Sequence, residues 1–249
     1  MNLDFYKHIK NRKLIFNSAY FLIKKYWNVK AQFTNYDYPE NNVNSLSKQE
    51  IKEYNKNRIF GPQRRFCYAP YNNLHFKTNG DVTLCSFNAK LKIGNIAQNN
   101  LIDIWNSKSA DYFRNKMSDY DLSHCLECKL FFNFKNYSSL PTTKYDLHAT
   151  DDITYPSQMS FEISNLCNLE CVMCNENFSS AISKRKNIPL RKNAYTERFI
   201  QQLDIFIPHL KIATFIGGEP LLIKAYFKIW NNIIANNKKC KIHVQTNAT

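Results

Sequence analysis

Three cysteines on one short loop constrain this chain more than any other feature of its sequence. Cys167, Cys171 and Cys174 have the spacing C-x3-C-x2-C, shortly after residues 159–164, where apolar and polar residues alternate as in a strand. Three thiolates cannot close a four-coordinate site, but they can hold three corners of a [4Fe-4S] cluster and leave one iron open. Structural zinc needs a fourth ligand, and no histidine follows at zinc-finger spacing. The spacing therefore favours an iron–sulfur site at the end of a strand.

A glycine-rich turn follows the next predicted strand. Residues 212–216 form a short apolar run, and Gly217, Gly218, Glu219 and Pro220 come directly after it. The two glycines allow the backbone to approach a ligand closely, and the proline suits the first turn of a helix. The glutamate supplies a carboxylate that could receive an ammonium group. The motif is more specific here than it would be alone, because it follows the strand that comes after the cysteine loop.

Strands and helices alternate in the second half of the chain. Strands are predicted at 159–164, 212–216 and 241–245, and helical periodicity is present over 195–210 and 222–236. This order predicts an α/β fold with parallel strands joined by right-handed crossovers. Parallel α/β barrels place their chemistry at the carboxyl ends of the strands, where the cysteine loop lies.

Together these motifs resemble the radical S-adenosylmethionine (SAM) superfamily. Residues 165–174 look like the cluster loop of that family, and residues 217–220 look like its motif for the methionyl amino group of SAM. Met173 stands where the family usually has an aromatic residue that packs near the adenine, and a flexible thioether can pack similarly. Asn247 belongs to a Thr-Asn sequence that resembles one near the SAM site of the family.

The resemblance implies an enzyme with a catalytic [4Fe-4S] cluster on Cys167, Cys171 and Cys174. Contacts to SAM are expected from Gly217, Gly218, Glu219, Pro220, Met173 and Asn247. Such enzymes cleave SAM reductively to a 5′-deoxyadenosyl radical that abstracts hydrogen from a substrate, using a reductant such as a flavodoxin or ferredoxin. Barrels of this family contain further βα units. We therefore expect a partial parallel barrel, truncated after its third strand or completed by another chain.

Four further cysteines lie on a predicted hairpin and a predicted knuckle. Cys67 and Cys85 flank a hairpin that turns at Asn79-Gly80, and Cys125 and Cys128 form a C-x2-C pair further along. Four thiolates make a closed site. Taken alone, this segment suits structural zinc and an iron–sulfur cluster equally well.

The same segment resembles the SPASM/twitch auxiliary-cluster domain of radical SAM enzymes. The resemblance lies in Cys67-Tyr68-Ala69-Pro70, Asn79-Gly80, Cys85, Gly94-Asn95, Ile104-Trp105 and Cys125-x2-Cys128. It implies one auxiliary [4Fe-4S] cluster on the four cysteines, as in the short twitch form, which would pass electrons or anchor substrate. In the family this domain commonly follows the barrel, whereas here it precedes it. Related enzymes often modify peptides or proteins, so we expect a peptide-like substrate ahead of a small molecule.

Composition shifts divide the chain into four expected segments. These are a helical N-terminal segment (1–65), a small α+β SPASM/twitch-like domain (66–131), a polar linker (132–156) and the N-terminal part of a radical SAM core (157–249). Ser47 to Glu50 forms a capping-box pattern that predicts a helix in the first segment. The apolar stretch 14–23 is too short to span a bilayer and is followed by Lys24-Lys25 rather than a cleavage site. We expect an amphipathic helix there and no membrane partner.

The net charge and the pattern of cysteines indicate the compartment and the binding partners to expect. Seven of the eight cysteines follow metal-ligand patterns, which indicates metal binding in a reducing compartment, the cytoplasm. The eighth, Cys240, is expected to pack as a small apolar residue. The net charge is +14, but the lysines are scattered, so a solvated basic surface is favoured over an RNA-binding face. Two alternatives stay open: a zinc module that binds RNA, and a catalytically incomplete iron–sulfur subunit for electron transfer. Metal content and SAM cleavage separate them.

Overall fold

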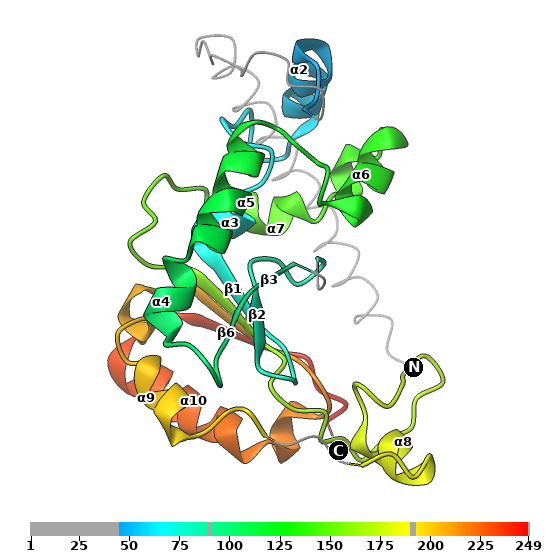
Figure 1. Cartoon of the computed structure of the whole chain (residues 1–249), viewed down its shortest axis with the longest axis vertical. Coiled ribbons are helices and arrows are strands. Elements are labelled where there is room, and N and C mark those ends of the chain that lie inside the picture. The colour runs from blue at the N-terminus through cyan, green and yellow to red at the C-terminus, as the bar shows by residue number, and fades with distance from the viewer. Residues whose placement is uncertain (1–44, 89–90, 190–192, 249) are drawn as a thin grey trace, which may run out of the picture. The chain divides into compact units, whose positions relative to one another are not determined.

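The computed structural model describes residues 45–88, 91–189 and 193–248. The chain forms two compact units (Figure 1). Unit 1 comprises Met1–Cys67 and Lys116–Leu147, and unit 2 comprises Tyr68–Asn115 and His148–Thr249. These units divide the chain by compactness, and the four segments expected from the sequence stay a prediction. The expected helix over 14–23 lies outside the described residues.

Unit 2 is built on one six-stranded sheet with the order β3-β2-β1-β4-β5-β6. Its strands are β1 (Asn73–Phe76), β2 (Asp81–Thr83), β3 (Lys92–Asn95), β4 (Gln158–Phe161), β5 (Ile212–Phe215) and β6 (Lys241–Val244). Strands β1, β4, β5 and β6 pair in parallel, whereas β2 pairs antiparallel with both β1 and β3. The α/β class and the parallel arrangement of the three predicted strands are confirmed. Closure of these strands into a radical SAM barrel stays a prediction.

The predicted hairpin is present and extends this same sheet. Gly80 takes a φ of +84° in the turn between β1 and β2, a conformation that glycine adopts without steric cost. Strand β1 then pairs with β4 along its whole length, from Asn73 opposite Gln158 to Phe76 opposite Phe161. The hairpin and the predicted core strands therefore share one sheet. The sequence did not reveal this pairing, because it joins strands about eighty residues apart and leaves no local signal.

The two faces of the sheet differ in polarity. Successive side chains on a strand point to opposite faces, and apolar and polar residues alternate along these strands. On one face Phe76, Phe161 and Phe215 stack in a row, with neighbouring ring centroids 5.1 and 4.9 Å apart. This face packs against α9 (Glu197–Gln202) and α10 (Lys224–Asn236), which lie on the same side of the sheet (Figure 1). The opposite face carries polar residues from all four parallel strands.

The helix expected over 195–210 is shorter in the structure. Helix α9 ends at Gln202, and a 3-10 turn, η2 (Ile207–His209), follows. Pro208 lies in that turn and lacks the amide that a continuing helix would use. The apolar residues that give this stretch its helical period are nevertheless buried: Phe199, Leu203, Phe206 and Leu210.

The other helices that begin in unit 2 are short. They are α3 (Ala69–Asn72), α4 (Leu101–Trp105), α5 (Lys108–Ser118), α8 (Ser180–Arg185) and η3 (Pro220–Leu222). In the part of the chain that the structure describes, no helix combines the length and apolar character that a membrane crossing needs.

Unit 1 is helical where it is described. It contains α2 (Lys48–Asn57), α6 (Leu126–Asn133), η1 (Tyr137–Ser139) and α7 (Thr142–Asp146). The predicted capping box is confirmed at the start of α2: the Glu50 amide donates to Ser47 Oγ (3.3 Å), and the Ser47 amide donates to Glu50 Oε2 (2.8 Å). The stretch 132–156, which the sequence suggested as a linker, carries η1 and α7.

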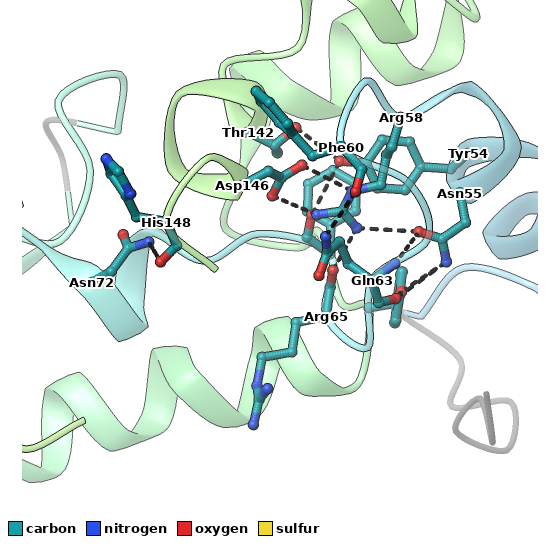
Figure 2. Close-up of polar contacts among 12 residues, drawn as sticks. Tyr54, Asn55, Arg58, Phe60, Gln63, Arg65, Asn72, Thr142, Asp146 and His148 are labelled. Atoms are coloured by element: carbon teal, nitrogen blue, oxygen red, sulfur yellow. Dashed lines mark hydrogen bonds and ion pairs between the residues drawn. The ribbon is translucent and has the colours of Figure 1, made fainter. Parts of the chain in front are cut away.

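A buried ion pair organises unit 1 (Figure 2). Arg58 donates from Nε and Nη2 to the two carboxylate oxygens of Asp146, at 2.9 and 2.6 Å, and both side chains are 2% exposed. The third guanidinium nitrogen, Nη1, donates to the carbonyl of Arg65 at 2.6 Å. The Tyr54 hydroxyl donates to the carbonyl of Phe66 at 3.1 Å. The network therefore holds the backbone that leads directly into Cys67.

We expect Arg58→Ala to lower the free energy of unfolding by about 3–5 kcal/mol, because it leaves the Asp146 carboxylate buried without a partner. Urea denaturation followed by circular dichroism measures this change. Lys135→Ala is the control, since Lys135 is 71% exposed in its pair with Glu53 and such pairs contribute about 0–1 kcal/mol. Equal losses in the two variants would contradict the organising role of the buried pair.

Candidate metal and cofactor site

A cavity of about 470 Å³ lies at the carboxyl ends of β4, β5 and β6. The cysteine loop follows β4, the Gly-Gly-Glu turn follows β5, and Thr246-Asn247 follows β6. Eight of the predicted site residues line the cavity: Cys167, Cys171, Met173, Cys174, Gly217, Gly218, Glu219 and Asn247. Pro220 is buried at the start of η3 and is not among the lining residues. Parallel pairing of the strands thus gathers motifs that are far apart in sequence.

Helix α8 anchors the cysteine loop. Ser180 Oγ accepts a hydrogen bond from the Cys167 amide at 3.0 Å and donates to the Cys167 carbonyl at 3.1 Å. Ser179 caps the helix and donates to the carbonyl of Leu169 at 2.7 Å. The Leu169 amide in turn donates to the sulfur of Cys167 at 3.4 Å. These contacts hold the backbone on both sides of Cys167 and the sulfur itself.

The three thiols of the loop share one cavity wall. Cys171 is exposed, Cys167 and Cys174 are partly buried, and none of the three is in a disulfide. Within the described residues, no three His, Cys, Asp or Glu side chains are gathered closely enough to hold one metal ion. Met173 is 92% exposed beside them, so its thioether is accessible to a ligand. As a donor set, three accessible thiols on one loop suit a cluster that keeps one iron open.

The glycine turn is laid directly against the start of the cysteine loop. The Gly218 amide donates to the carbonyl of Ser164 at 3.0 Å, and the Glu219 amide donates to the carbonyl of Leu166 at 2.6 Å. Gly217 has a φ of +101°, and a Cβ on Gly218 would lie 2.1 Å from the carbonyl oxygen of Leu166. Both glycines are therefore required by the backbone itself.

The Glu219 carboxylate ties the ends of β5 and β6 together. Its Oε1 accepts from the Leu221 amide (2.9 Å) and from Thr246 Oγ1 (2.6 Å), and its Oε2 accepts from the Asn247 amide (2.7 Å). Burial of the carboxyl group opposes its ionisation, but these hydrogen bonds outweigh burial and hold the pKa of Glu219 below its usual range. The contact of Glu219 with an ammonium group stays a prediction. In the structure its carboxylate fixes the strand ends around the cavity.

We expect Glu219→Gln to cost about 2 kcal/mol of unfolding free energy at pH 7, because an ionised acceptor of three hydrogen bonds is lost. Since the folded pKa is lowered, this contribution is fully present above the unfolded pKa of about 4.3 and is lost as the pH falls through the folded value. The difference between wild type and variant should therefore shrink below about pH 4. Denaturation curves at both pH values measure it, and a pH-independent difference would contradict the assignment.

The four other cysteines are distributed over the two units. Cys67, Cys125 and Cys128 belong to unit 1, and Cys85 follows β2 in unit 2. Cys125 is the N-cap residue of α6, and Cys128 is buried in the first turn of that helix. Cys67 is also buried. Their role as a common ligand set stays a prediction from the sequence.

Residues 67–129 match the SPASM family model, which describes an iron-sulfur cluster-binding domain. The match supports a SPASM-type domain in this segment. It begins at Cys67 and spans Cys85, Cys125 and Cys128, so all four predicted auxiliary ligands lie within it. Searches of curated proteins and of solved structures found no match to the chain. The SPASM family is associated with radical SAM enzymes, but the matched segment ends well before the cysteine loop.

The SPASM-type segment contributes to the sheet beside the cavity, because β1, β2 and β3 all lie within it. Several lining residues were not among the predicted site residues, and two of them are Glu162 and Gln245. The signal that could have found these two is the two-residue period of the strands: each lies just beyond a strand and continues its polar face. Sequence reasoning also missed Ser180 and the hydrogen bond from Thr246 to Glu219, because both depend on contacts between distant segments.

Proposed function

We propose that this protein is a radical SAM enzyme that cleaves SAM reductively to a 5′-deoxyadenosyl radical and abstracts hydrogen from a substrate. One observation carries the proposal: three motifs, each after a different parallel strand, line the same cavity. The SPASM-type match adds support, because this domain is typical of radical SAM enzymes.

The proposal gives each motif a role. Cys167, Cys171 and Cys174 would hold the catalytic [4Fe-4S] cluster, and Gly217 to Glu219, Met173 and Asn247 would contact SAM, while Pro220 would shape the turn that carries Glu219. When bound, the cluster and SAM supply the one-electron chemistry, while the protein binds, orients and excludes water. The hydrogen bonds that Ser180 and Ser179 make with the cysteine loop hold it in place, and those to Glu219 keep the strand ends at a fixed separation.

The SPASM-type segment would hold a second, auxiliary [4Fe-4S] cluster through Cys67, Cys85, Cys125 and Cys128. Electrons would come from a cytoplasmic flavodoxin or ferredoxin. We propose a peptide or protein as substrate ahead of a small molecule, because enzymes with auxiliary clusters of this type often modify peptides.

Metal content and SAM cleavage test the proposed function. After anaerobic reconstitution we expect about eight irons with matching sulfide per chain, and 5′-deoxyadenosine with methionine after addition of SAM and dithionite. Stoichiometric zinc with little iron would overturn the proposal in favour of a zinc module. About eight irons without any SAM cleavage would instead indicate an electron-transfer subunit.

A further inference from the structure

The cavity is acidic in a chain that is strongly basic. The net charge of the chain is +14, yet among the described residues that line the cavity there are two carboxylates, Glu162 and Glu219, and no Lys, Arg or His. Both oxygens of Glu219 already accept hydrogen bonds from the protein. Glu162 differs, because within the described part of the chain its carboxylate has no hydrogen-bond donor closer than His75 Nε2 at 3.5 Å. It is thus the lining carboxylate available to a ligand.

Sheet register places Glu162 on the floor of the cavity. It follows Ser160 by two residues and therefore continues the polar face of β4. Ile216 and Gln245 continue β5 and β6 on the same face and also line the cavity. The Glu162 amide donates to the carbonyl of Phe76 on the neighbouring strand at 2.8 Å. The backbone that carries this carboxylate is therefore fixed by β1.

His75 approaches the side chain of Glu162 from that same strand. The histidine is 1% exposed, and its Nε2 lies 3.5 Å from Glu162 Oε2. Within the described residues its other ring nitrogen, Nδ1, has no hydrogen-bond partner, so the contact with Glu162 is its one polar side-chain interaction there. Because β1 belongs to the SPASM-type segment, that segment supplies a side chain that acts on the cavity of the cysteine loop.

We propose that Glu162 is the counter-carboxylate of the SAM sulfonium and that His75 is its positioning residue. The inference rests on the proposed function, in which SAM occupies this cavity. A sulfonium carries a full positive charge but no N–H group, so a protein recognises it by electrostatic attraction rather than by hydrogen-bond geometry. The Glu162 carboxylate suits that requirement. Within the described residues it accepts no strong hydrogen bond, and no Lys, Arg or His lines the cavity.

The test compares SAM with S-adenosylhomocysteine, which lacks the sulfonium charge. Equilibrium dialysis of the reconstituted protein under anaerobic conditions gives both dissociation constants. We expect Glu162→Gln to weaken SAM binding about tenfold, while binding of the neutral analogue changes less than about twofold, because a single ion–ion attraction is lost. Glu176→Gln is the matched control: its carboxylate pairs with Lys186 outside the cavity lining, so neither constant should change.

Three further variants separate an effect on the position of the Glu162 carboxylate from an effect on folding. Glu162→Asp keeps the charge and should retain the preference for SAM. His75→Gln keeps a nitrogen donor beside the carboxylate and should also retain it, whereas His75→Leu should lower the preference about threefold with iron content unchanged.

Failure of this inference and failure of the proposed function give different results. A fully iron-loaded wild type that binds neither ligand would overturn the proposed function. If wild type binds SAM but Glu162→Gln weakens both ligands equally, or neither, the function stands and the role of Glu162 in sulfonium recognition is wrong.

Discussion

Simultaneous replacement of Cys167, Cys171 and Cys174 by alanine is expected to remove about four of about eight irons per chain and to abolish formation of 5′-deoxyadenosine. The three thiols line the same cavity, and Cys171 is exposed. Their loss would remove the whole protein ligand set of the proposed catalytic cluster. The auxiliary cluster should remain, because its predicted ligands lie in the separate SPASM-type segment. Iron and sulfide analysis, with chromatography of the SAM products, measures both effects.

Cys240→Ala is the control for this experiment. Burial raises the pKa of the Cys240 thiol to about 11, so it stays protonated at neutral pH and is a poor metal ligand. It packs against the apolar core, as expected from the sequence. Iron content and SAM cleavage should therefore match wild type. If the triple variant keeps all its iron, or still cleaves SAM at the wild-type rate, the cysteine loop does not hold the catalytic cluster.

Local patterns allowed much of the site to be predicted. The Ser47–Glu50 capping box, the turn at Gly80 and the three parallel strands each depend on residues close together in sequence, and the structure has all of them. The cysteine loop and the glycine turn were expected at the same rim, because parallel strands present their carboxyl ends together. The cavity that both line agrees with that expectation.

Contacts between distant segments could not be predicted in this way. Arg58 and Asp146 are 88 residues apart, and neither residue type indicates burial. The pairing of β1 with β4 likewise depends on the folded sheet, and it is this pairing that brings His75 to Glu162. The alternation of polar and apolar residues along β4 indicates only the face of the sheet on which Glu162 lies. The ligand environment of the cavity therefore emerges from tertiary structure.

Gly218→Ala is expected to lower SAM affinity at least tenfold and to destabilise the protein by about 2–3 kcal/mol. A Cβ at this position would lie 2.1 Å from the carbonyl oxygen of Leu166 and 2.5 Å from its carbonyl carbon. Those atoms belong to the backbone that leads into Cys167, so they cannot move aside as a flexible side chain would. The glycine turn and the cysteine loop would be pushed apart, and the cavity between them would change shape. Equilibrium dialysis with SAM and urea denaturation measure the two effects.

Gly80→Ala distinguishes a local effect on the cavity from general destabilisation. Gly80 has a φ of +84°, and a Cβ there would approach the side chain of Ala194 at 2.9 Å, so this variant should lose about 1–2 kcal/mol. It lies in the β1–β2 turn, outside the cavity lining, and SAM affinity should stay within about twofold of wild type. Both substitutions add one methyl group to a glycine in unit 2, but only the methyl group at Gly218 would meet the backbone that leads into the cysteine loop. Equal SAM affinities in the two variants would show that close packing of Gly218 on Leu166 does not shape the binding site.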